Sequence, residues 1–161
     1  MRCACLLLVV GFGAVAQAAE HPSWDSLAKL FDKPKDAPEV VALVRERELS
    51  EITKGPSGSI SSRDQSYSLL YRQNKINTIV VRVAPWREKF SEPHWQVFSG
   101  KLPGDLSVDD GRDEVIKKLG MPLESRKNTW KQNGLHIWVH FNQKQDGISE
   151  LFVSPGVIEA E

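Results

Sequence analysis

The chain contains two cysteines, Cys3 and Cys5, and both lie among its first residues. It also lacks long uninterrupted runs of apolar residues. The apolar run at residues 6–15 is shorter than the roughly 20 residues that a membrane-spanning helix needs. A short basic start precedes this run, and Ala16-Gln17-Ala18 follows it, which is the pattern of a secretory signal peptide. We therefore expect residues 1–18 to be cleaved after Ala18 and the mature protein to be periplasmic.

Removal of that segment leaves residues 19–161 without a thiol. Disulfides, cysteine metal ligands and a cysteine nucleophile are then excluded, and the fold must depend on a hydrophobic core. A chain of about 150 residues buries roughly 68–70% of the surface that it exposes when unfolded, which is enough for one stable domain. We expect a single domain over residues 19–161.

The chain also lacks an excess of either charge. It has 21 Lys and Arg against 21 Asp and Glu, and the two signs are interspersed. No basic stripe points to nucleic acid or to an anionic membrane surface. The sequence therefore predicts neither of these partners.

Motifs for catalysis and cofactor binding are equally scarce. The mature chain has no G-x-S-x-G pattern, phosphate-binding loop or dinucleotide fingerprint. Ser26-Leu27-Ala28-Lys29 matches S-x-x-K, but the companion motifs of that hydrolase class are missing. His136 and His140 would lie about 13 Å apart along a strand, too far to share one metal ion. We expect no enzymatic activity, no cofactor and no metal site.

One acidic cluster leaves two interpretations open. Asp105, Asp109, Asp110, Asp113 and Glu114 could act as paired carboxylates on a glycan. They also surround the expected start of a helix, where negative charge is favourable and Asp110 could cap free N–H groups. The second interpretation is the more ordinary one for such a cluster.

The remaining sequence is that of an α+β protein. Ser23 is a suitable N-cap for a first short helix, and Pro38 suits the first turn of a second at residues 38–50. A loop is expected at 55–59, a hairpin at 67–83, a short strand at 94–98, a helix at 111–119, and strands near 125–131, 135–141 and 148–153. We expect an antiparallel sheet with helices packed on one face.

Two stretches of the chain resemble each other, which suggests an internal duplication. Residues 36–85 and 98–155 each run helix, loop, strand, turn, strand and proline. The segments "INTIVVRVAP" and "ISELFVSP" both begin with Ile and end in proline. These stretches are candidates for two repeated helix-hairpin units.

The segment "LHIWVHF" at residues 135–141 alternates with period two. Leu135, Ile137, Val139 and Phe141 form an apolar face, while His136, Trp138 and His140 share the opposite one. Tryptophan is enriched in binding hot spots, so that second face is either a partner surface or a second packed layer. The other candidates for the partner surface are Trp86, Trp95 and His94, whereas Trp24 and Trp130 are expected in or beside the core.

The C-terminal part resembles a known bacterial module. The segments "FSGKLPGDLSVDDGRDEVIKKLGMP" and "GLHIWVHFN…GISELFVS" match a G-x-L-P-x-x-L loop, a D-x-R-x-E-V-x-x-x-L-G-x-P helix and a hairpin. This pattern is similar to that of immunity-type proteins paired with secreted toxins. The helix-then-hairpin duplication also resembles β-lactamase-inhibitor-like folds and small outer-membrane assembly proteins. The matched positions are Gly100, Leu102, Pro103, Leu106, Asp110, Arg112, Glu114, Val115, Leu119, Gly120 and Pro122.

The leading hypothesis is a periplasmic binding protein that neutralises a toxin or hydrolase effector by occluding its active site. Such a protein would be an immunity protein of an antibacterial secretion system, for example type VI secretion. Its partner would be the cognate effector, and the oligomeric state is left open. The alternative is an envelope assembly or scaffolding module of the outer membrane.

Overall fold

The alternating segments of the sequence form one antiparallel sheet with helices on one side. The structure is a computed structural model that describes residues 21–52, 55–83, 97–142 and 144–156. Its strands are β1 (Ser50–Glu51), β2 (Ser57–Ser61), β3 (Tyr67–Arg72), β4 (Lys75–Arg82), β5 (Thr129–Gln132), β6 (Leu135–Phe141) and β7 (Ile148–Ser154). The helices are α1 (Trp24–Ala28), α2 (Pro38–Glu46) and α3 (Arg112–Leu119), and a 3-10 turn, η1, spans Pro103–Asp105.

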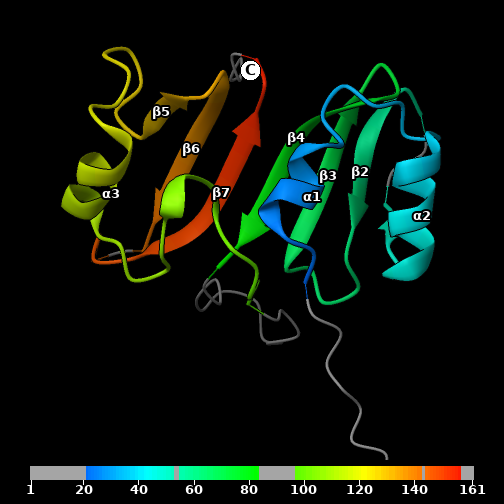
Figure 1. Cartoon of the computed structure of the whole chain (residues 1–161), viewed down its shortest axis with the longest axis horizontal. Helices are drawn as coiled ribbons and strands as arrows, with labels where there is room; N and C mark the ends of the chain where they lie inside the picture. The colour runs from blue at the N-terminus through cyan, green and yellow to red at the C-terminus, as the bar shows by residue number, and fades with distance from the viewer. Residues whose placement is uncertain (1–20, 53–54, 84–96, 143, 157–161) are drawn as a thin grey trace, which may run out of the picture.

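The strands follow the order β1-β2-β3-β4-β7-β6-β5 across the sheet. Consecutive strands pair as neighbours except at the centre, where β4 lies against the last strand, β7 (Figure 1). The register there places Ile79 opposite Val153 and Val81 opposite Leu151. One continuous sheet thus joins the N-terminal and C-terminal parts of the described chain.

Two tight turns set the registers of the hairpins. Gln73 and Asn74 both have positive φ and connect β3 to β4. Asn133 and Gly134 do the same between β5 and β6. A two-residue turn with two positive φ angles matches the right-handed twist of the flanking strands, and Asn-Gly is its most typical sequence.

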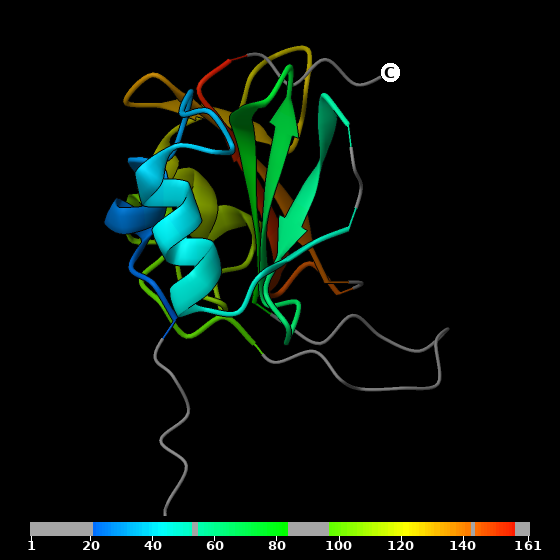
Figure 2. The ribbon, with the colours of Figure 1, turned by 90° about the vertical axis from the view of Figure 1, so that its right-hand side faces the viewer.

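All three helices lie on the same side of the sheet, and no described helix lies on the other (Figure 2). The core fills the space between the helices and the sheet. Helix side chains such as Leu27, Val40 and Val115 are completely buried there, as are Leu69 of β3 and Leu151 of β7. We call the side of the sheet that points away from the helices the open face.

The helix starts agree with their sequence signals in two of three cases. The Ser23 side chain accepts a hydrogen bond from the Ser26 N–H, and Pro38 stands in the first turn of α2. The expected Asp110 cap is wrong, because Gly111 occupies the N-cap position of α3 without a side-chain hydrogen bond. Asp110 instead accepts a hydrogen bond from the Ser107 N–H at 2.6 Å and binds the Lys118 ammonium at 2.7 and 2.9 Å.

Several expected elements differ from the structure, among them the strand expected near 125–131, which is β5 at Thr129–Gln132. The loop expected at 55–59 is largely strand β2, because residues 57–61 pair along β3. The second helix, expected to reach residue 50, ends at Glu46, and its Val41 is 42% exposed. The strand expected at 94–98 lies mostly outside the described residues, and Phe98 itself is buried in irregular structure.

Both tryptophans assigned to the core are there. Trp24 of α1 is 8% exposed and Trp130 of β5 is completely buried. The indole N–H of Trp130 donates a 2.9 Å hydrogen bond to the carbonyl of Gly120, the residue that ends α3. This bond ties the edge strand β5 to the helical layer.

Candidate binding face

The side chains of the open face can be assigned from the strand registers, because residues directly opposite in an antiparallel pair share a face. Trp138 stands opposite Thr129 on one side and Phe152 on the other. Phe152 in turn stands opposite Val80, and Val80 opposite Ser68. The row therefore crosses from β5 to β3, on the side away from the helices. The sequence prediction that Trp138 faces away from the core is confirmed.

An aromatic cluster occupies the β6–β7 part of this face. The Trp138 and His140 rings meet edge to face with centroids 4.5 Å apart. Phe152 lies 5.2 Å from each of them, tilted by 35° against Trp138. All three side chains are half-buried, so each ring keeps part of its surface in solvent. Edge-to-face and tilted contacts of this kind hold the rings in fixed positions.

A row of charged side chains borders the aromatic cluster, and these side chains form ion pairs with one another. Glu150 lies between Arg82, whose Nε is 3.1 Å from its carboxylate, and His140, whose Nδ1 is 3.6 Å away. Arg82 also donates to the Gln65 carbonyl at 2.7 Å. The carboxylate is therefore held on two sides, and a partner that covers the cluster does not have to compensate a free charge at Glu150.

Beyond β4 the open face changes from aromatic residues to small hydroxyl residues. The Ser61 and Ser68 hydroxyls are hydrogen-bonded to each other at 2.8 Å, and both residues are buried. Arg82 donates to the Ser68 hydroxyl at 3.2 Å, which connects the serine pair to the charged row. Large rings on one half of the sheet thus stand beside a half that carries buried serines and Leu70.

His136 completes the predicted histidine pair in a different environment from His140. Its side chain lies between Lys131 of β5 and Ser154 of β7, and only 8% of the residue is exposed. Its Nδ1 atom is buried and makes no hydrogen bond within the described part of the chain. A buried polar atom without a partner is costly, and its burial keeps this nitrogen out of reach of a partner on the open face.

The predicted site is therefore assembled only in part. The structure brings Trp138, His136 and His140 to one face. Trp86, Trp95 and His94 lie outside the described residues, so their place relative to this face stays a prediction. Phe152, Glu150 and Arg82 were missed from the sequence. Period-two alternation in 148–153 groups Glu150 with Phe152, but nothing local indicates which strands lie beside them.

The acidic cluster is arranged as separate ion pairs with lysines. Asp105 lies 3.0 Å from Lys101, Glu114 pairs with Lys117, and Asp110 with Lys118. The lysine hydrogen bond to Asp105 lowers the pKa of that carboxyl. Each of these three carboxylates is thus bound by a different lysine. No group of three potential metal-binding side chains occurs within the ranges that the structure covers.

A hydrogen-bond network centred on His21 was not predicted from the sequence. His21 Nδ1 accepts a hydrogen bond from the Ser99 N–H at 3.0 Å, while its Nε2 lies 2.9 Å from Asp64 and 3.0 Å from the Ser66 hydroxyl. The ring also stacks on Phe98 with centroids 5.2 Å apart. We call these residues the His21 clasp. They join the start of the described chain to the β2–β3 turn and to the segment before η1.

The clasp contains Ser, His and Asp, and the Ser99 hydroxyl lies 2.9 Å from Nδ1 while Asp64 lies 2.9 Å from Nε2. The Nδ1 lone pair that a general base would need is, however, engaged by the Ser99 backbone N–H. The backbone donor at Nδ1 places the imidazole proton on Nε2, from which it is donated to Asp64. Nε2 then has no lone pair with which to accept a proton from Ser66. Burial alone would raise the pKa of Asp64, but hydrogen bonds from Ser62, His21 and Ser66 outweigh it and lower the pKa to about 2. The clasp thus links three segments of the described chain.

No helix within the described ranges is long and apolar enough to cross a membrane. No protein family, characterised protein sequence or solved structure gave a significant match to this chain. The resemblance to immunity-type proteins therefore stays a prediction. Two of the positions that carry the resemblance are Asp110 and Gly120. Their hydrogen bonds, to Lys118 and Trp130, hold α3 in place.

Proposed function

We propose that the chain is an exported periplasmic binding protein that neutralises a toxin or hydrolase effector by occluding its active site. The observation that carries this proposal is the aromatic cluster of Trp138, His140 and Phe152 on the open face. Signal-peptide cleavage after Ala18 would deliver it to the compartment where such effectors act. In this view the protein performs no chemistry of its own.

The physical argument concerns what a partner meets at this face. Aromatic side chains bury much surface for the loss of few rotatable bonds, which makes them the usual centres of binding energy. The rings are already fixed against one another, so little conformational entropy is lost on binding. The paired charges of Arg82 and Glu150 beside them do not have to be separated. Such a surface is suited to tight binding by a preformed patch.

We further propose that the fold arose by duplication of a helix-hairpin unit, with residues 36–85 and 98–155 as the two copies. In support, α2 precedes β2, β3 and β4, and α3 precedes β5, β6 and β7. The last strands of the two stretches, β4 and β7, lie side by side at the centre of the sheet, and their neighbours follow in mirrored order. Two copies would together make a sheet wide enough to receive an enzyme's surface loops.

The proposal is tested with the product of the neighbouring gene, sent to the periplasm of a sensitive bacterial strain. Co-expression of the chain should protect the cells, and the purified pair should form a stoichiometric complex. Trp138→Ala should abolish protection and weaken the complex at least tenfold. Lys127→Ala, an exposed change in the loop before β5, is the matched control and should protect fully.

Other outcomes would identify other functions. Failure of the wild-type chain to protect, together with co-fractionation with the outer membrane and a deletion defect in the absence of any toxin, would indicate the envelope scaffold instead. Hydrolysis of an envelope polymer by the purified chain would overturn the binding proposal itself. N-terminal sequencing of the exported protein should find Ala19 as the first residue.

A further inference from the structure

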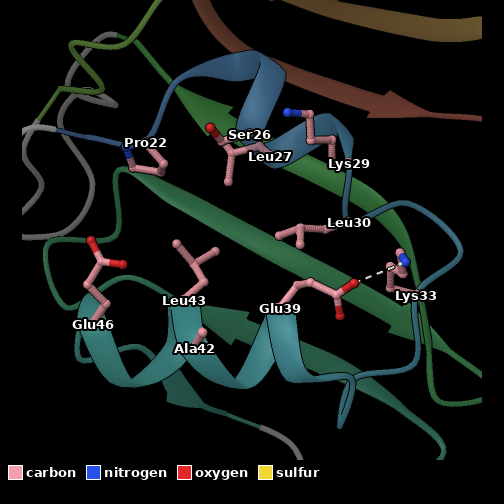
Figure 3. A pocket seen from close by; sticks show the side chains of 10 residues that line it. All are labelled: Pro22, Ser26, Leu27, Lys29, Leu30, Lys33, Glu39, Ala42, Leu43 and Glu46. Atoms are coloured by element: carbon pink, nitrogen blue, oxygen red, sulfur yellow. Dashed lines mark hydrogen bonds and ion pairs between the residues drawn. The ribbon is translucent and has the colours of Figure 1, made fainter.

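A groove runs between α1 and α2, on the opposite side of the molecule from the open face. Its volume is about 540 Å³, and it is lined by α1, the turn that follows α1, and α2. Leu27 and Leu30 on one wall and Leu43 on the other point toward each other across it (Figure 3). Of these three lining residues, Leu27 and Leu30 are buried and Leu43 is half-buried. This size and apolar lining are typical of small-molecule sites, which have volumes of roughly 300–1,000 Å³.

The charges around the groove are compensated except at one position. Lys33 pairs with Glu39 at 3.1 Å and thereby links the two walls at one end of the groove (Figure 3). Glu46, near the other end, pairs with Arg47 at 3.2 Å. Lys29 also lines the groove but has no ion pair within the described part of the chain. The uncompensated charge of the rim is therefore positive.

We infer that this groove binds an anionic amphiphile, specifically a medium-chain carboxylate. The alkyl chain would lie over Leu27, Leu30 and Leu43, where its burial supplies most of the affinity. The carboxylate would meet the Lys29 ammonium at the solvent-facing rim. A cationic amphiphile has no free counter-charge there, since Glu39 and Glu46 are both paired. An apolar helix of a partner could use the same floor, but it would leave Lys29 without a counter-charge unless it carried an acid.

The inference is independent of the proposed function, because the groove and the aromatic cluster lie on opposite sides of the sheet. A variant that loses ligand binding in the groove should still protect against an effector. A variant that loses protection through the aromatic cluster should still bind the ligand. The two proposals can therefore fail separately.

The test is calorimetric titration of the mature protein with decanoate below its critical micelle concentration. Decyltrimethylammonium, which has the same chain length and the opposite charge, is the matched ligand. Decanoate should bind with one molecule per chain, and decyltrimethylammonium should bind at least several times more weakly. In NMR spectra the methyl groups of Leu27, Leu30 and Leu43 should shift on addition of decanoate, while those of Leu70 on the open face should not.

Substitutions in the groove test whether decanoate binds there. Ala42 is an exposed lining residue of α2, so Ala42→Trp should fill the groove and abolish decanoate binding while the protein stays folded. Lys29→Ala should weaken decanoate binding about two- to fivefold, which is the usual effect of a partly exposed ion pair. Lys127→Ala removes a lysine outside the groove and should change nothing.

Three results would overturn the inference. The first is the absence of decanoate binding up to the micellar limit. The second is equal affinity for both amphiphiles, or leucine shifts outside the groove. The third is flotation of the protein with anionic phospholipid vesicles without binding of free decanoate, which would assign the groove to a membrane lipid.

Discussion

Leu69 and Leu70 are neighbours in β3, yet Leu69 is completely buried under the helical layer while Leu70 is half-buried on the open face. The same contrast separates Trp130, inside the core, from Trp138 on the adjacent strand. Alternation along a strand decides which residues share a face, but the helices decide which face becomes the core. Apolar residues on the remaining face are then available for a second task.

The largest difference between the faces is expected for the two tryptophans. Trp130→Ala should lower the free energy of unfolding by about 3–5 kcal/mol, because it removes a fully buried ring and leaves the Gly120 carbonyl without its donor. Trp138→Ala should cost at most about half as much, since the ring is already partly in solvent. Chemical denaturation monitored by circular dichroism measures both. Equal losses would mean that the open face is a second core.

The adjacent leucines give a smaller contrast within one strand. Leu69→Ala should destabilise the protein by about 2–5 kcal/mol through the lost burial and the cavity that it leaves. Leu70→Ala should cost about 1 kcal/mol, because its side chain has less surface to lose from the interior. Denaturant midpoints with unchanged m-values would establish the difference. A larger loss for Leu70 would reverse the assignment of the two faces.

Asp110 tests how α3 is attached to the loop that precedes it. Asp110→Asn removes a buried negative charge that holds Lys118 and accepts from the Ser107 N–H, and should cost about 1–3 kcal/mol. Asp113→Asn, in the exposed first turn of α3, is the control and should change stability by less than about 0.5 kcal/mol. The effector binding proposed for the open face should be the same for both variants. Equal stabilities would show that the Lys118 contact contributes nothing.

The His21 clasp gives the smallest effect, and it depends on pH. Because folding lowers the pKa of Asp64 from 3.8 to about 2, its contribution is complete above pH 3.8 and is lost as the pH falls toward 2. Asp64→Asn should therefore be less stable than wild type at pH 5, with the difference narrowing between pH 4 and pH 2. Thermal unfolding at a series of pH values measures this. A difference independent of pH would contradict it.

Much of the fold was predictable because its signals are local. The Ser23 cap, the proline of α2, the hairpin turn after Arg72 and the alternation of β6 each depend on a few adjacent residues. Strand β2 was missed because glycine and serine at 57–59 are typical of loops, and only pairing with β3 makes the segment a strand. Asn133-Gly134 is a strong hairpin signal that would have placed β5 more accurately.

The candidate site was less predictable because it depends on contacts between distant residues. Trp138 could be assigned to a face from its own strand, whereas Phe152 and Arg82 reach it only through the registers of β7 and β4. The partners of His21 are 43 and 78 residues away in the sequence. The spacing of residues within one segment cannot predict contacts between residues so far apart in the sequence.

The junction of β4 with β7 also affects how the chain can be made. Residues 79–82 cannot find their partners until residues 150–153 have left the ribosome, and closing so long a loop is slow. A nascent chain therefore leaves this junction unformed until β7 has been synthesised. For the export proposed above, that delay would keep the polypeptide unfolded enough to pass a translocation channel.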